Sequence, residues 1–158
     1  MRAALALASE AAAEGEVPVG AVVVCDGEIV GTGRNRREKG KNALYHAELE
    51  AIDNACKTCG GWRLHKCDLY VTLEPCPMCA GAIINARIKT LYYGAGDSKA
   101  GSVGSVINLF EVPYNHKPEV IAGVMEEECA ALLKQFFRQL RESKKQSGEA
   151  DVSRLAEE

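Results

Sequence analysis

The sequence predicts an α/β protein, a three-layer α/β/α sandwich in which a mixed sheet carries helices on both faces. Three observations lead to this prediction. Segments with strand patterns alternate with segments of helical pattern. No linker or internal repeat divides the chain, and 158 residues suit one domain. We therefore expect a single domain over residues 1–143, followed by a polar, disordered tail over residues 144–158.

The first three elements follow from local patterns. Residues 1–15 are rich in alanine and end in glycine, which favours a helix. Residues 17–35 predict a hairpin, because a β-branched run and a second strand pattern flank the turn pair Asp26-Gly27. Residues 47–56 place alanines four positions apart, which indicates a helix with a face of small side chains.

The remaining elements continue the alternation of strand and helix. Two prolines mark the entry of the middle helix, where missing amide hydrogens are tolerated. A loop rich in glycine and serine precedes the last strand. We expect strands over residues 68–73, 88–95 and 119–124, helices over residues 76–87 and 126–142, and the loop over residues 96–105.

Composition and charge exclude several classes of protein. The residues are 47% hydrophobic and 26% charged, which is typical of a globular protein rather than a fibre or a disordered chain. No run approaches the roughly 18 apolar residues of a membrane span, and Glu10 interrupts the first apolar run, so we expect no signal peptide and no membrane partner. Seven cysteines favour reduced thiols or metal ligands in the cytoplasm. The net charge of -3 does not indicate nucleic-acid binding, although residues 34–41 and 134–145 are basic.

The segment CKTCGGWRLHKCDLYVTLEPCPMC holds five of these cysteines and allows two metal sites. In one, two C-x-x-C pairs form a closed structural zinc ribbon. In the other, one pair joins a histidine, and the metal keeps an open position for water. The first set is Cys56, Cys59, Cys76 and Cys79; the second is His46, Cys76 and Cys79.

Three features favour the second set. Cys76 and Cys79 open a predicted helix, where they share a face and the exposed amides favour thiolates. The other cysteine pair lies where a helix ends in a Gly-Gly loop. Glu48 follows His46 by two residues, and H-x-E with P-C-x-x-C is the signature of zinc nucleobase deaminases. Residues two apart point in different directions on a regular helix, so His46 and Glu48 converge only if the helix begins beside them.

Seven segments resemble the TadA family of bacterial tRNA adenosine deaminases across nearly the whole chain. They are EVPVGAVVV, GRNR, YHAELEAI, LYVTLEPCPMCAGAIINARI, YYGAGDSKAGSVGS, NHKPEV and EEECAALLKQFFR. The resemblance implies a cytidine deaminase-like fold and a homodimer. It also implies a hydrolase that cleaves a carbon–nitrogen bond of a cyclic amidine, converting adenosine to inosine at the wobble position of a tRNA anticodon stem-loop.

The resemblance also implies roles for individual residues. One Zn²⁺ per chain, with a bound water or hydroxide, is held by His46, Cys76 and Cys79, and Glu48 shuttles protons. The remaining positions contact the substrate. They are Asn35 on the purine, Val71, Leu73 and Pro75 on the wall of the base pocket, and Asp97, Lys99, Phe137 and Arg138 on the RNA strand.

Two other functions stay open. A deaminase of a free nucleobase or nucleoside, of the guanine or cytosine type, would share the zinc chemistry but need no basic surface. A non-catalytic zinc-ribbon module would need Cys56 and Cys59 and could dispense with Glu48. The family pattern does not require the thiols of Cys56, Cys59 and Cys67. With His65 these could bind a second metal, but free surface thiols are the better interpretation.

Overall fold

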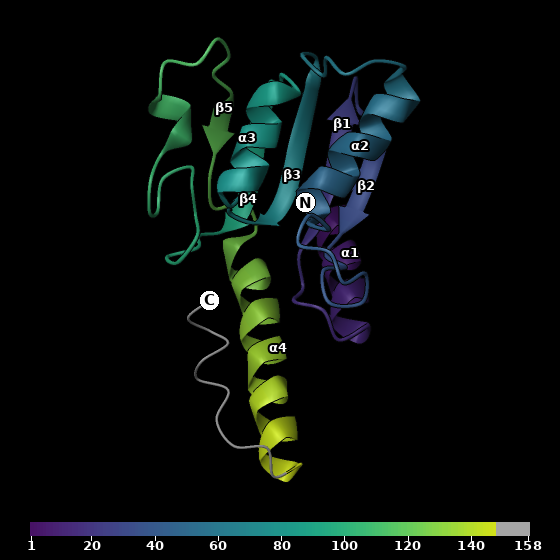
Figure 1. Cartoon of the computed structure of the whole chain (residues 1–158), viewed down its shortest axis with the longest axis vertical. Helices are drawn as coiled ribbons and strands as arrows, with labels where there is room; N and C mark the ends of the chain where they lie inside the picture. Colours follow the sequence, from purple (N-terminus) through teal and green to yellow (C-terminus); the bar gives the residue numbers. More distant parts are fainter. Residues whose placement is uncertain (148–158) are drawn as a thin grey trace.

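A computed structural model describes residues 1–147 and places five strands in one mixed sheet of order β2-β1-β3-β4-β5 (Figure 1). The central strand β3 lies antiparallel to β1 and parallel to β4, and β5 continues the parallel half. β2 pairs antiparallel with β1 as the predicted hairpin. The strands are β1 (Gly20–Cys25), β2 (Glu28–Arg34), β3 (Cys67–Leu73), β4 (Thr90–Ala95) and β5 (Glu119–Ile121).

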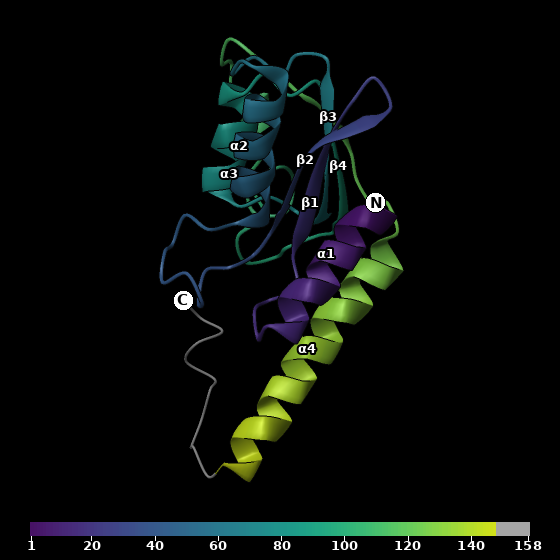
Figure 2. The same ribbon diagram turned by 90° about the vertical axis from the view of Figure 1, so that its right-hand side faces the viewer.

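Helices cover both faces of this sheet, which confirms the predicted three-layer architecture (Figure 2). On one face lie α2 (Ala47–Cys59) and α3 (Pro77–Asn85). On the other lie α1 (Arg2–Ala13) and α4 (Glu126–Gln146). A short 3-10 helix, η1 (Leu109–Glu111), lies between β4 and β5 in the chain. Within residues 1–147, no helix qualifies as a membrane span.

Some boundaries differ from those predicted. α2 continues to Cys59 and ends at Gly60, whose φ of 71° is the left-handed conformation that commonly terminates a helix. α4 runs to Gln146, past the predicted start of the tail. Three glutamates in its first turn and two lysines in its last suit the helix dipole. The rest of the predicted tail, residues 148–158, lies outside the described residues.

Small residues bring α2 close to β2. Gly33 and Gly31 face the backbone of α2, and a Cβ on either glycine would overlap it. Ala47, Ala51 and Ala55 form the matching face of the helix and are fully buried. The alanine spacing therefore predicted the packed face, and the two glycines set the depth at which α2 lies against the sheet.

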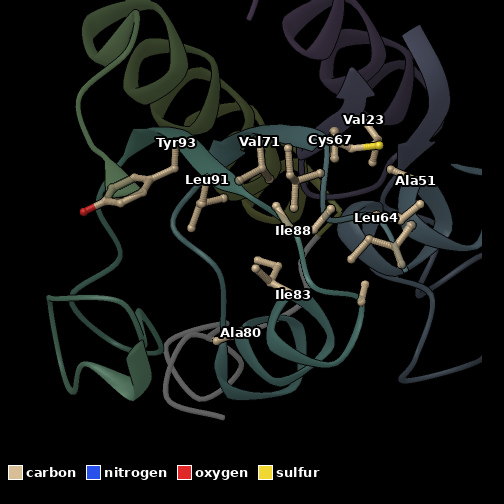
Figure 3. Close-up of a cluster of buried hydrophobic side chains, with 14 of the residues drawn as sticks. Val23, Ala51, Leu64, Cys67, Val71, Ala80, Ile83, Ile88, Leu91 and Tyr93 are labelled. Carbon is tan, nitrogen blue, oxygen red and sulfur yellow. The ribbon is translucent and has the colours of Figure 1, made fainter. Parts of the chain in front are cut away.

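A continuous hydrophobic core fills the space between the sheet and the layer of α2 and α3 (Figure 3). Leu69 and Leu91 contribute from the central strands, and Ile83 contributes from α3. This core also contains Val71, which is fully buried. The packing places α2 and α3 on one face of the sheet, with the N-terminus of each helix toward the end of the sheet at which β3 ends (Figure 1).

Candidate active site

The start of α2 carries His46 and Glu48. His46 is the N-cap residue, with extended backbone angles of φ -85° and ψ 150°, and the helix begins at Ala47. Glu48 lies in the first turn and is 4% exposed. The chain therefore changes direction between the two residues, which is the condition under which a histidine and a glutamate two positions apart can reach one site.

The start of α3 brings two cysteines to the same place. Cys76 is the N-cap residue of α3, and Cys79 follows one turn later. Their Sγ atoms lie 3.6 and 3.5 Å from His46 Nδ1. The three donor atoms all lie within 4.8 Å of one another, so His46, Cys76 and Cys79 can hold a metal ion.

The four-cysteine ribbon is wrong. Cys56 lies near the far end of α2, ten residues from His46, which at about 1.5 Å per helical residue is about 15 Å away. Among residues 1–147, no second group of three or more donors gathers as closely as the His46 group, so the second metal site also lacks support. Cys59 is exposed and Cys67 is buried, as free thiols.

Burial and hydrogen bonding shift the pKa values of these groups. Hydrogen bonds with Cys79 and His46 lower the pKa of Cys76 to about 4, which favours a thiolate. The hydrogen bond to Cys76 and burial raise the pKa of Cys79. The hydrogen bond with Cys76 raises the pKa of His46. Burial raises the pKa of Glu48 to about 7. At neutral pH the pair Cys76 and Cys79 therefore carries one negative charge, on the thiolate of Cys76, and this charge attracts a cation.

A cavity of about 190 Å³ opens beside these residues. A water's share of liquid volume is about 30 Å³, so the cavity has room for a small ring system but not for folded RNA. Its walls come from the segment before β1, the residues just after β2, the end of β3, the starts of α2 and α3, and the loop after β4. The lining residues are Val17, Val19, Asn35, Arg37, His46, Ala47, Glu48, Leu73, Glu74, Cys76, Asp97 and Ala100.

Comparisons with known proteins identify the family. The model of the MafB19-like deaminase family matches residues 1–141. The tRNA-specific adenosine deaminase of Bacillus subtilis (strain 168) is 49% identical over 146 residues, which are 92% of this chain and 91% of that protein. The chain belongs to the tRNA-specific adenosine deaminase family. The member from Agrobacterium fabrum (strain C58) is 47% identical over 142 residues, 89% of this chain and 93% of that one.

A solved structure of this deaminase family has the same fold. It comes from studies of A-to-I editing by tRNA:A34 deaminases at the wobble position of transfer RNA. The two chains superpose with a TM-score of 0.82 at 46% identity, over 84% of this chain and 97% of that one. The cytidine deaminase-like fold, which the resemblance implied, is therefore confirmed.

Asn35 occupies the wall of the cavity in this deaminase. Its Nδ2 donates a hydrogen bond to Val17 O at 3.1 Å, and its Oδ1 accepts one from the amide of Arg37 at 3.0 Å. These bonds use half of the capacity of an amide, which has two N–H groups and two lone pairs. The side chain is therefore held rigidly and retains a donor and an acceptor.

The other predicted substrate contacts divide into two groups. Leu73 and Asp97 line the cavity together with Asn35. Val71 does not line it: this residue faces the same side of the sheet as Leu73 but lies two residues farther into β3, where its side chain is buried in the core (Figure 3). Pro75 is buried at the junction of β3 and α3, where its carbonyl accepts a hydrogen bond from Ser102 at 2.9 Å.

Apart from Asp97, the predicted RNA contacts lie outside the cavity. Lys99 is exposed on the loop after β4, beside Asp97. Phe137 is 39% exposed on α4, and Arg138 is exposed next to it. Several lining residues were not predicted from the sequence as site residues, namely Val17, Val19, Arg37, Ala47, Glu74 and Ala100. All six lie in or beside segments that carry the family resemblance, which was the available signal.

Proposed function

We propose that the chain is a zinc-dependent hydrolase that converts adenosine to inosine at the wobble position of a tRNA anticodon. One observation carries this proposal: a His-Cys-Cys donor group and the buried Glu48 meet at one base-sized cavity in a chain of the tRNA-specific adenosine deaminase family. We also propose that it acts as a homodimer in the cytoplasm, where its tRNA substrate is found.

The donor group suits zinc. Zinc–nitrogen and zinc–sulfur bonds of about 2.1 and 2.3 Å, at a tetrahedral angle, place the two ligand atoms about 3.6 Å apart. The Sγ atoms of Cys76 and Cys79 lie 3.6 and 3.5 Å from His46 Nδ1. Two thiolates and an imidazole favour zinc over the harder cations. When bound, zinc lowers the pKa of water from about 15.7 to about 7 and so supplies a nucleophile at neutral pH.

The overall reaction exchanges one bond at C6 of adenine. A carbon–oxygen bond forms to the oxygen of water, the bond from C6 to the exocyclic nitrogen breaks, and the amine leaves as ammonia. A proton must move from water to the ring at N1, and another must reach the departing amine. We assign both transfers to Glu48, because this residue lines the cavity in the first turn of α2, next to His46.

Asn35 and Leu73 orient the base. The amide of Asn35 provides hydrogen bonds to the purine edge, and Leu73 provides an apolar wall against its face. An anticodon loop presents bases that are already unstacked, so the base enters without the cost of opening a duplex. On the outer surface, Phe137 offers a ring for base stacking, and Arg138 and Lys99 offer charges for phosphates.

A deamination assay tests this proposal. The zinc-loaded protein is incubated with an anticodon stem-loop that carries adenosine at the wobble position, and in parallel with guanine, cytosine, adenosine and cytidine. We expect inosine in the RNA and no conversion of the free bases or nucleosides. Conversion of guanine or cytosine instead would show a free-base deaminase with the same metal site, and no conversion in any sample would contradict the enzymatic proposal.

A further inference from the structure

We propose that Glu74 is a positioning residue whose buried carboxylate holds the loop of residues 96–105 in the conformation that presents Asp97 to the cavity. The inference deepens the proposed function, on which it rests: Glu74 sets the affinity for the RNA substrate and leaves the chemical step to Glu48. Nothing in the motif H-x-E and P-C-x-x-C assigns Glu74 a role, although it lies between β3 and Cys76.

The carboxylate of Glu74 accepts four hydrogen bonds from this loop. Oε2 accepts from the amide of Asp97 at 2.9 Å and from the hydroxyl of Ser105. Oε1 accepts from the amide of Ser105 at 3.0 Å and from that of Val103 at 3.3 Å. Glu74 is 2% exposed. A buried carboxylate is costly unless it is hydrogen-bonded, so the loop conformation and the charge stabilise each other.

The backbone around Glu74 is tied to both neighbouring segments. The amide of Glu74 donates to Ala95 O at 2.8 Å, at the end of β4, and Ser102 donates to Pro75 O at 2.9 Å. Gly101 lies against the carboxylate so closely that a Cβ there would overlap Glu74 Oε2 and Asp97 O. The loop is therefore wrapped around one side chain, and its shape depends on that side chain.

The link to the substrate passes through Asp97. Its amide donates to Glu74, while its Oδ1 accepts from the amides of Lys99 and Ala100 at 2.9 and 3.2 Å. Asp97 and Ala100 line the cavity. A loop with three glycines has many alternative conformations. Without the hydrogen bonds to Glu74, the loop would be restricted to one of these conformations only when RNA binds, and binding would carry the entropic cost. This entropic cost would reduce the affinity for the RNA substrate.

Glu74→Gln tests the inference with almost no change in size. Each carboxylate oxygen accepts from at least one backbone amide, so in either orientation the new NH2 group faces an N–H donor. With the NH2 group at the Oε2 position, the bond to Asp97 is lost. With it at the Oε1 position, the bonds to Val103 and Ser105 are lost. No orientation of glutamine preserves the anchor.

The first measurement is kinetic. We expect KM for the anticodon stem-loop to rise about tenfold while kcat changes by less than about twofold. The reason is that at least one backbone N–H of the loop loses its acceptor, whereas Glu48 and the metal ligands stay in place. Zinc content should stay at the wild-type value. If Glu74 acts through Asp97, then Glu74→Gln combined with Asp97→Ala should lose less than the product of the two single losses.

The second measurement is amide hydrogen exchange, which needs no activity. In Glu74→Gln, the amides of Asp97, Val103 and Ser105 should exchange faster, while those of α3 keep their protection. Thr90→Val is the matched control. Thr90 is also a buried polar residue, at the opposite end of β4, and its hydroxyl contacts Glu119 Oε2 at 3.5 Å. The Thr90→Val variant should leave both KM for the stem-loop and the amide hydrogen exchange of residues 96–105 unchanged.

Three results would overturn the inference: a wild-type KM, a loss confined to kcat, or unchanged exchange at Asp97. Failure of the proposed function has a different signature, because wild-type protein would then make no inosine in the stem-loop. In that case the exchange experiment still decides whether Glu74 holds the loop, since it compares only the free proteins.

Discussion

Replacing Gly33 by alanine tests how closely α2 must approach the sheet for the site to form. An alanine Cβ at this position would lie 2.7 Å from the amide nitrogen of Ala51 and 2.9 Å from Glu50 Cβ, and it would overlap the carbonyl of Ala47. Ordinary contact begins at 3.4 Å, so relieving the contact with Ala51 alone requires a shift of about 0.7 Å. All three contacts are with α2, so this helix must retreat from β2.

The shift separates the two halves of the site. His46 and Glu48 begin α2, whereas Cys76 and Cys79 begin α3, which follows β3 and holds none of the three atoms nearest to the new Cβ. A misplacement of about 1 Å can cost about 10²-fold in rate, so we expect kcat to fall by about 10- to 100-fold. Overpacking typically costs about 1–3 kcal/mol. At about 2–4 °C per kcal/mol for a chain of this size, Tm should fall by about 2–12 °C.

The assay measures inosine formation, zinc content and thermal unfolding of the same preparation. Gly61→Ala is the matched control, because a Cβ at Gly61 meets nothing within 4 Å. This substitution should change neither kcat nor Tm. A Gly33→Ala protein with wild-type kcat and wild-type Tm would refute the reasoning, since it would show that α2 can lie farther from β2 without loss.

Three further predictions concern single groups and one surface. The Glu48→Ala variant should keep its zinc and lose about 10²- to 10⁴-fold in kcat. Metal analysis and an assay of inosine formation check this prediction. An active, zinc-loaded variant would contradict the role of Glu48. Iodoacetamide at pH 8, followed by mass spectrometry, should label the exposed Cys59 but not Cys67. Burial raises the pKa of Cys67 to about 12, so this residue stays a protonated thiol that does not react. Labelling of Cys67 in the native protein at the rate of Cys59 would disprove its burial. Alanine at four basic positions of α4 should weaken RNA binding and reduce its salt slope by up to about 3 in a titration against salt, and an unchanged slope would remove α4 from the RNA surface. These positions are Arg138, Arg141, Lys144 and Lys145.

The sequence by itself determined the fold class and the reactive groups, because both are encoded in short-range patterns. The alanine spacing in residues 47–56 identified the buried face of α2. The prolines beside Cys76 identified the start of α3, and helix starts orient the residues next to them. His46 and Glu48 were predicted to converge only beside a helix start, and the helix does begin at Ala47.

Only the tertiary structure decided which distant segments meet. It separated Cys56 and Cys59 from the metal group by the length of α2, and it buried Val71 in the core while Leu73, on the same face of β3, lines the cavity. It also placed Glu74 inside the loop that carries Asp97, more than twenty residues away. These outcomes depend on how deeply α2 packs on β2 and on where buried hydrogen-bond donors find acceptors. Both are set by contacts between segments far apart in the chain, and no local spacing records them.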